Sequence, residues 1–161
     1  MDDYHMRREE KQITQQDELI EIINDNKVFS LAMCRNNDPY LVSMNYGYEI
    51  TKNCFYFHSA KEGKKIDYLE NNPKVWGEIR EDHGYLIGEC DHAYRTLHFE
   101  GKVEFIEDIE EKKRALEVMV DHVEPDPEPI KKRFLEKGDL DEVKIGKVNI
   151  KNMWGKKGGV D

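Results

Sequence analysis

The chain has 161 residues, 37% of them charged, and a formal net charge of −9 at pH 7. A chain of this length can bury a substantial core, and we expect one domain over residues 1–161. The acidic balance excludes nucleic acid as the main partner, because binding a polyanion needs a basic face. The apolar runs are only several residues long, so the sequence predicts no membrane partner.

The three cysteines are scattered and odd in number: Cys34, Cys54 and Cys90. This usage is typical of a reducing compartment rather than of a disulfide framework. The polar N-terminus also lacks the apolar segment of a signal peptide. We therefore expect a cytoplasmic protein.

The first half of the chain predicts one helix followed by three strands. Residues 1–12 are polar and are expected to be flexible. Thr14 followed by Asp17 resembles a helix-opening capping box, and the apolar spacing after it indicates a helix that ends near residue 25. Apolar runs and period-two alternation then predict strands, joined by turns, at residues 28–33, 40–50 and 54–58.

The second half predicts three more strands and three helices. Helical patterns begin at Glu62 and stop at Asn71-Asn72-Pro73, and two further helices are predicted at residues 108–123 and 130–137. Alternation predicts strands at residues 74–80, 94–106 and 143–153, with a bulge or bend at Gly101. We expect residues 81–92 to be a turn or long loop and residues 155–161 to be a flexible tail.

Six strands joined mostly by turns, with helices at the edges, favour a mainly β fold with flanking helices. The arrangement expected is a six-stranded antiparallel β-barrel, and the long bent strand at residues 94–106 suits barrel closure. An open α+β sheet is the alternative.

The segment over residues 57–69 carries the clearest functional signal. A buried strand leads into Ser59, Gly63 and a lysine pair, Lys64 and Lys65, at the start of a helix. Backbone N–H groups at a helix start and nearby ammonium groups both favour a bound phosphate. The two lysines would point about 100° apart on a helix, so we expect only one to reach the ligand. The alternative is a solvated helix start with ordinary surface lysines.

Histidines and cysteines offer further candidates for chemistry. His58 could donate a proton to a reduced substrate, or it could only hydrogen-bond the backbone or the phosphate. Cys90 with His92 and two neighbouring histidines matches no closed zinc pattern, so the sequence predicts a structural loop there and no metal site.

The order of these pieces resembles the flavin-binding split barrels related to pyridoxamine 5′-phosphate oxidase, and among them the nitroimidazole-resistance (Nim-like) branch. The resemblance runs from about residue 10 to residue 155. It is carried by Phe29-Ser30-Leu31-Ala32-Met33, residues 38–48, Phe55-Tyr56-Phe57-His58-Ser59-Ala60, Gly63-Lys64-Lys65, Asn72-Pro73-Lys74-Val75, Tyr94-Arg95-Thr96 with Gly101, and residues 105–108.

The resemblance implies a split barrel that works as a homodimer, with FMN, or FAD in its place, in clefts at the subunit interface. Ser59 would hold the phosphate with Lys64 or Lys65. The isoalloxazine would face Ser43, Asn45 and Tyr46, while Arg95 and Thr96 approach from the long strand of the same or the partner subunit. His58 would lie beside the flavin as the candidate catalytic residue.

The implied function is an FMN-dependent oxidoreductase that reduces a small planar electron acceptor, such as a nitroimidazole-type compound. Two alternatives stay open: a flavin-binding protein without turnover, acting as a store or sensor, and a pyridoxamine-phosphate-oxidase-like enzyme. Many relatives carry Gly-Arg where this chain has Phe29-Ser30, so a phosphate-binding arginine is missing. The segments specific to true pyridoxamine-phosphate oxidases are also missing, which weakens the second alternative.

Overall fold

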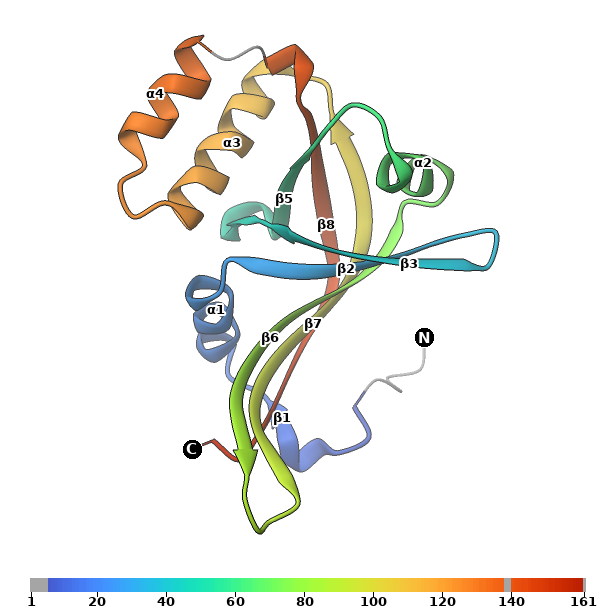
Figure 1. The fold of residues 1–161 in the computed structure, drawn as a ribbon, viewed down its shortest axis with the longest axis vertical. Coiled ribbons are helices and arrows are strands. Elements are labelled where there is room, and N and C mark those ends of the chain that lie inside the picture. The colour runs from blue at the N-terminus through green and yellow to red at the C-terminus, as the bar shows by residue number, and fades with distance from the viewer. Residues whose placement is uncertain (1–5, 138–139, 161) are drawn as a thin grey trace.

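A computed structural model describes residues 6–137 and 140–160, which form one antiparallel sheet with helices around it (Figure 1). The strands are β1 (Gln12–Ile13), β2 (Val28–Arg35), β3 (Asp38–Asn45), β4 (Gly47–Glu49), β5 (Cys54–Ser59), β6 (Lys74–Leu86), β7 (Asp91–Ile106) and β8 (Lys144–Gly158). The α-helices are α1 (Gln16–Asp25), α2 (Lys64–Asn71), α3 (Ile109–Val123) and α4 (Glu128–Lys137). Within the described ranges, none of the helices has the length and apolar character needed to cross a bilayer.

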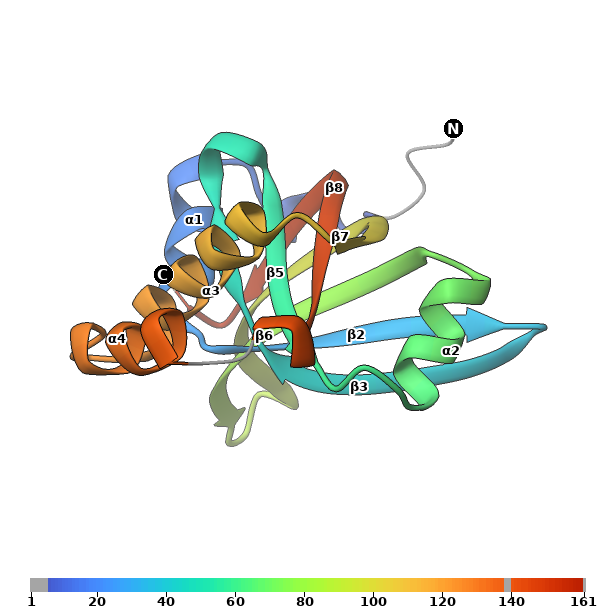
Figure 2. The same cartoon turned by 90° about the horizontal axis from the view of Figure 1, so that it is seen from above.

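The sheet has the strand order β3-β2-β6-β7-β8-β5-β4, and β1 pairs with β8 outside this path. The two ends of the path, β3 and β4, are consecutive in the sequence and are separated only by Tyr46. The path of described strands nevertheless stays open there, so the sheet curls into a barrel that does not close (Figure 2). The predicted mainly β, antiparallel fold with flanking helices is therefore confirmed, with eight strands in place of six.

Aromatic rings fill the interior of the curled sheet. Phe29, Tyr46, Phe55 and Phe99 are fully buried, and the rings of Phe55 and Phe99 lie 4.6 Å apart. A second, smaller core forms where α3 covers the outer face of β5, and Cys54 belongs to it. The apolar run of β5 is thus explained by burial on both faces.

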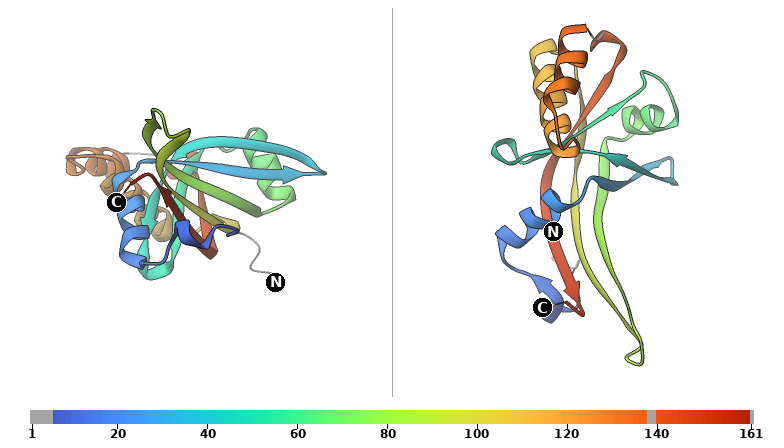
Figure 3. Two further views of the ribbon diagram at one scale, coloured as in Figure 1. Left: turned by 90° about the horizontal axis from the view of Figure 1, so that it is seen from below. Right: turned by 60° about the vertical axis from the view of Figure 1, so that its left-hand side comes forward.

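The longest paired segment is the ribbon of β7 and β8 (Figure 3). At one end Ile145 of β8 pairs with His58, and at the other Lys157 pairs with Arg95. These two β8 positions are 12 residues apart, which corresponds to about 40 Å along an extended strand. The register shifts between Glu100 and Gly101, so the bulge predicted near Gly101 is confirmed.

Residues 81–92 differ from the prediction of a loop, because β6 and β7 continue through them as a projecting hairpin (Figure 3). Their polar composition hides the strand pattern. In the structure the polar side chains pair with one another: His83 Nε2 lies 2.9 Å from a carboxylate oxygen of Glu81, and His92 Nε2 lies 2.6 Å from one of Asp82. The first pair lies within β6 and the second joins β6 to β7, and a cross-strand pair of this kind stabilises a hairpin that has little apolar surface.

The two ends of the chain also differ from the prediction of flexible segments. β8 extends to Gly158, and Gln12 and Ile13 pair with Lys156 and Gly155. A Cβ added at Gly155 would meet the side chain of Leu19, so the absent side chain lets α1 pack closely on this strand. Residues 1–5 and 161 lie outside the described part.

The predicted capping box at Thr14 and Asp17 is wrong. α1 begins at Gln16, and its N-cap, Gln15, makes no side-chain hydrogen bond. The predicted second strand is likewise divided into β3 and β4, because the buried Tyr46 interrupts it.

Gly47 lets β4 pack directly against α3, the helix that flanks the candidate site described below. A Cβ placed on Gly47 would lie 2.7 Å from the backbone nitrogen of Met119. Backbone atoms of a helix cannot yield as a flexible side chain does. We therefore expect Gly47→Ala to lower the free energy of unfolding by about 1–3 kcal/mol, measured by urea denaturation. The neighbouring exposed position provides the control: Thr51→Ala should change it by less than about 0.5 kcal/mol, and equal effects would contradict the packing argument.

Candidate functional site

Three elements meet at one corner of the barrel: the end of β3, the end of β5 and the start of α2. β5 delivers His58 and Ser59 to this corner, and Gly63 precedes α2 with a φ of 136°, a conformation that favours glycine. No side chain caps the first N–H groups of α2. Uncapped N–H groups at a helix start carry partial positive charge and are suited to an anion.

Lys65 is the most informative side chain at this corner. Its Nζ lies 3.0 Å from the Sδ of Met44 and 5.5 Å from the ring centroid of Phe57, and burial lowers its pKa. Among the described residues no carboxylate forms an ion pair with it, although the chain carries an excess of acidic residues. A half-buried ammonium group held by a thioether and an aromatic ring lacks a counter-charge. The corner therefore fits a bound anion.

Lys64 points away from Lys65, as the helical spacing predicts. Its Nζ lies over the rings of Tyr40 and Tyr68, 4.6 Å and 5.3 Å from their centroids. Lys61, in the loop before α2, forms an ion pair with Glu142 at 2.9 Å. Lys65 is thus the lysine whose charge acts on His58, whereas the ammonium group of Lys64 lies over two tyrosine rings.

His58 lies between Lys65 and an apolar cavity. His58 is an exposed residue, but partial desolvation of its imidazole lowers its pKa, and the charge of Lys65 lowers it further. In the part of the chain that the structure describes, no side chain hydrogen-bonds to this imidazole. His58 and Asn45 line the same cavity, which has a volume of about 390 Å³. The Nδ2 of Asn45 also donates to the backbone carbonyl of Lys27 at 3.0 Å.

Ser43 is exposed on the same face of β3 as Asn45, and its Oγ lies 2.9 Å from the Oγ of Ser30. The structure thus brings Asn45 and His58 to one cavity and places Lys65 near His58, with Ser59 at the end of β5. Ser43 lies on the face of β3 opposite to Met44, the residue that Lys65 contacts. Met44 and the apolar cavity were missed by the sequence analysis. The alternation of β3 does not show that a lysine from another element will lie on Met44.

Tyr46 lies in the core instead. It is fully buried, and its hydroxyl lies 2.7 Å from the carbonyl oxygen of Ile23 and 2.8 Å from that of Asn26. Burial raises the pKa of this phenol. Only the backbone of Tyr46 can contribute to a surface site, and its side chain does not face the corner.

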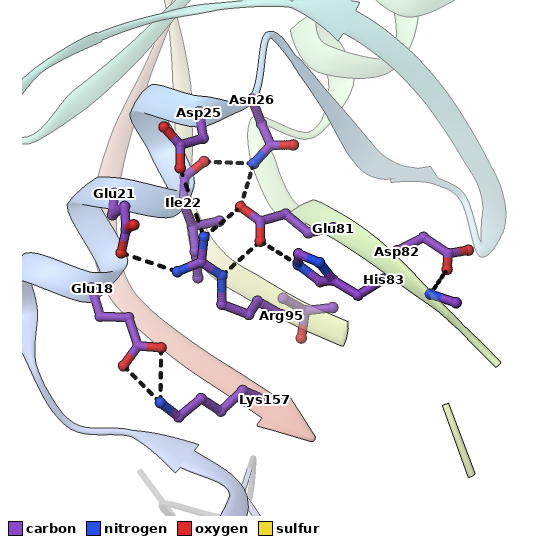
Figure 4. Close-up of polar contacts among 12 residues, drawn as sticks. Glu18, Glu21, Ile22, Asp25, Asn26, Glu81, Asp82, His83, Arg95 and Lys157 are labelled. Carbon is purple, nitrogen blue, oxygen red and sulfur yellow. Dashed lines mark hydrogen bonds and ion pairs between the residues drawn. The ribbon is translucent and has the colours of Figure 1, made fainter. Parts of the chain in front are cut away.

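Arg95 lies at the far end of the β7–β8 ribbon, inside an acidic cluster (Figure 4). Its guanidinium contacts Glu81 at 2.6 Å and 3.2 Å, Glu21 at 3.0 Å and Asp25 at 3.7 Å. Thr96 is buried, and its Oγ1 lies 3.4 Å from the carbonyl oxygen of Lys156. Arg95 and Thr96 could join a site with His58 only if a second subunit brings its ribbon end to the corner.

A second hollow, of about 860 Å³, lies on the charged side of α3 and α4. Lys131 lines it and forms ion pairs with Asp121 and Glu128. Because that charge is already matched within the chain, we place the candidate site at the β3–β5–α2 corner.

Comparison with known proteins places this architecture in a family. A model of the pyridoxamine 5′-phosphate oxidase family matches residues 15–157, and the chain belongs to this family. None of the curated proteins matches.

Solved structures show the same fold. A "putative 5-nitroimidazole antibiotic resistance protein" from Bacteroides thetaiotaomicron VPI-5482 is 30% identical, with 90% of this chain and 85% of that chain covered and a TM-score of 0.74. An FAD-binding protein from Mesorhizobium loti is 20% identical, with 92% and 98% covered and a TM-score of 0.67. A flavocytochrome from Azotobacter vinelandii is 16% identical, with 96% and 72% covered and a TM-score of 0.80.

The environment of His58 predicts its titration. Because partial desolvation and the charge of Lys65 both disfavour the imidazolium, its midpoint should lie below 6.5. Replacing Lys65 by Met should raise the midpoint, since one of the two causes is removed. Two-dimensional NMR of the imidazole carbons measures both values, with Lys113→Met as a control of equal charge change. An unshifted midpoint in Lys65→Met would contradict the proximity of the two groups.

The Arg95 cluster predicts a pH-dependent stability. Burial opposes ionisation of Glu81, but hydrogen bonds from Arg95, His83 and Asn26 outweigh it, so its pKa is lowered from 4.5. Because the pKa of Glu81 is lower in the folded than in the unfolded protein, its ionised carboxylate stabilises the fold above pH 4.5. This contribution to the free energy of unfolding is lost as the pH falls through the folded-state pKa. Glu81→Gln should therefore lower the free energy of unfolding at pH 7 by about 1.5–3 kcal/mol, with a smaller difference at pH 3.5.

The exposed carboxylate of Glu21 gives the matched control, because it contacts the same guanidinium from solvent. Glu21→Gln should lower the free energy of unfolding by less than about 1 kcal/mol in the same kind of urea titration. A larger loss for Glu21→Gln than for Glu81→Gln would contradict this account of the cluster.

Proposed function

We propose that the protein binds FMN at the β3–β5–α2 corner and transfers electrons to a small planar acceptor. The observation that carries the proposal is the half-buried ammonium of Lys65 without a carboxylate partner among the described residues. A phosphate group supplies that missing charge and can accept hydrogen bonds from the N–H groups at the start of α2. Ser59 is placed to add a hydroxyl donor from the end of β5.

The same corner could hold the first phosphate of FAD, and one similar structure is that of an FAD-binding protein. We favour FMN because its terminal phosphate carries more negative charge than the phosphodiester of FAD and therefore neutralises the charge of Lys65 more completely. Ser43 and Asn45 are exposed near the end of β3, and we expect them to face the ring system, as the family resemblance implies.

We also propose a homodimer. Arg95 and Thr96 are about 40 Å along the ribbon from His58, so one chain cannot gather all the residues that the family resemblance implies. A two-fold dimer would bring the ribbon end of each protomer to the corner of its partner, giving two equivalent sites. Glu81 neutralises Arg95 within its own chain, so we expect Arg95 to position the ribbon end rather than to supply the phosphate's counter-charge.

When bound, FMN supplies the electron chemistry, and the protein supplies binding, orientation and proton supply. An external donor must provide the electrons. Reduction of a quinone or a nitro group consumes protons as well, and His58 is the titratable group beside the corner. Its lowered pKa makes the imidazolium a stronger acid but a less populated one at pH 7. We therefore expect turnover to rise as the pH falls toward the midpoint of His58.

The first test is the visible spectrum of the purified protein, followed by release and chromatography of any yellow cofactor. A protein that is colourless and fails to bind added FMN would overturn the proposal. A protein that binds FMN but, after reduction by dithionite, is not reoxidised by nitro compounds or quinones without oxygen would favour the store or sensor.

The lysine pair gives a sharper test. A charge-assisted hydrogen bond contributes about 1.5–3 kcal/mol, so Lys64→Ala/Lys65→Ala should weaken FMN binding about 10- to 150-fold. Lys65→Ala alone should account for most of the loss, because Lys64 lies over two tyrosine rings. Lys113→Ala, an exposed lysine of α3 paired with Glu110, is the control. Quenching of flavin fluorescence measures the affinities of wild type and of the three variants, and equal affinity in wild type and the double variant would refute the phosphate assignment.

A further inference from the structure

We infer that the cavity between α3, α4 and residues 140–143 is a binding site for neutral aromatic ring compounds that carry no phosphate. Its role as the acceptor site rests on the proposed function. Binding of the compound itself does not, because the cavity is formed within one chain. Its volume of about 390 Å³ is within the usual range for small-molecule sites.

The walls of the cavity come from one face of each helix. Leu116, Met119, Val120 and Val123 follow the i, i+3, i+4, i+7 spacing and form an apolar stripe along α3. α4 packs against α3 and adds Ile130 and Phe134 (Figure 2). Of the described residues that line the cavity, eight are apolar and three are polar. Such a lining favours a planar hydrocarbon ring over a polar ligand.

The polar residues are suited to orient a ring compound. His58 and Asn45 line the β-sheet side of the cavity, and the imidazole keeps its hydrogen-bonding capacity within the described chain. A carbonyl or similar group on the ring could therefore accept or share a hydrogen bond with His58. The position of His58, between this cavity and Lys65, links the cavity to the corner proposed for FMN.

The charge at the cavity selects against anions. No lysine or arginine occurs among the described residues that line it, and Glu124 contributes a negative charge. The nearest guanidinium known from the contacts of the lining is that of Arg133, which stacks on Phe134 and does not itself line the cavity. A phosphorylated substrate would need cationic partners that this lining does not offer. The cavity therefore disfavours the anions that the Lys65 corner attracts.

The entrance lies near α4. Phe134 is 42% exposed although it lines the cavity, and the guanidinium of Arg133 lies 4.8 Å from its ring centroid, so part of an apolar ring is presented to solvent at this point. A ligand that packs on Phe134 would remove apolar surface from water, which favours binding.

The test compares two probes of nearly the same shape, one of them neutral and the other negatively charged. 2-Naphthamide is neutral and 2-naphthoate is anionic, and both are titrated into the full-length protein, with and without added FMN, by calorimetry. We expect 2-naphthamide to bind at least tenfold more tightly than 2-naphthoate. His58→Ala should weaken 2-naphthamide about 2- to 12-fold, as expected for the loss of a neutral hydrogen bond.

A cavity-filling variant locates the site. Val123→Trp should abolish binding of 2-naphthamide, whereas Lys113→Trp, on the same helix but outside the lining, should retain it. Circular dichroism checks that both variants are folded. If Val123→Trp does not fold, NMR replaces this test: 2-naphthamide added to the wild-type protein should change the chemical shifts of His58. Equal affinity for both probes, or unchanged binding in folded Val123→Trp, would overturn the inference. Binding of 2-naphthamide by a protein that ignores FMN would refute the proposed function alone.

Discussion

The pairing of β7 with β8 is the constraint on which the rest of the structure depends. β8 binds β7 along nearly its whole length, β5 at one end and β1 at the other. The ribbon therefore fixes His58 and Arg95 at opposite ends of the molecule. It also separates Arg95 and Thr96 from His58 within one chain, which is the reason why we propose a dimer.

Charge distribution separates the two ends of the ribbon. At the Arg95 end, three carboxylates surround one guanidinium, so positive charge is matched within the chain. At the corner, the ammonium group of Lys65 lies on a thioether and an aromatic ring and has no carboxylate partner among the described residues. In a protein of net charge −9, a half-buried cation left without a carboxylate is unusual enough to indicate a ligand. The apolar cavity beside His58 then offers a distinct environment for an uncharged molecule.

The sequence predicts the elements that apolar periodicity controls. The buried run of β5, the long strand around Gly101, the apolar stripe of α3 and the cationic start of α2 are all visible in the residue pattern. The hairpin at residues 81–92 is not, because its strands are held by pairs between polar side chains rather than by an apolar face. The tail at residues 155–158 is ordered by β1 and α1, a long-range contact that a glycine- and lysine-rich composition does not reveal.

The candidate site, like the fold, could be predicted only where its residues are close together in the sequence. Ser59, Lys65 and His58 could be predicted because they follow one another at a strand-to-helix junction. Tyr46 shares the alternation of Val42 and Met44, which predicts a core-facing side chain, and its hydroxyl is bound to carbonyls at the end of α1. The family resemblance, rather than this alternation, assigned Tyr46 to the isoalloxazine. The central claim, that the corner recognises a phosphate, is tested most directly by comparing the affinities of FMN and riboflavin, which share the ring system and differ in the phosphate. Our account predicts that FMN binds at least tenfold more tightly and that Lys65→Ala removes most of the difference. Equal affinities for the two compounds would contradict it.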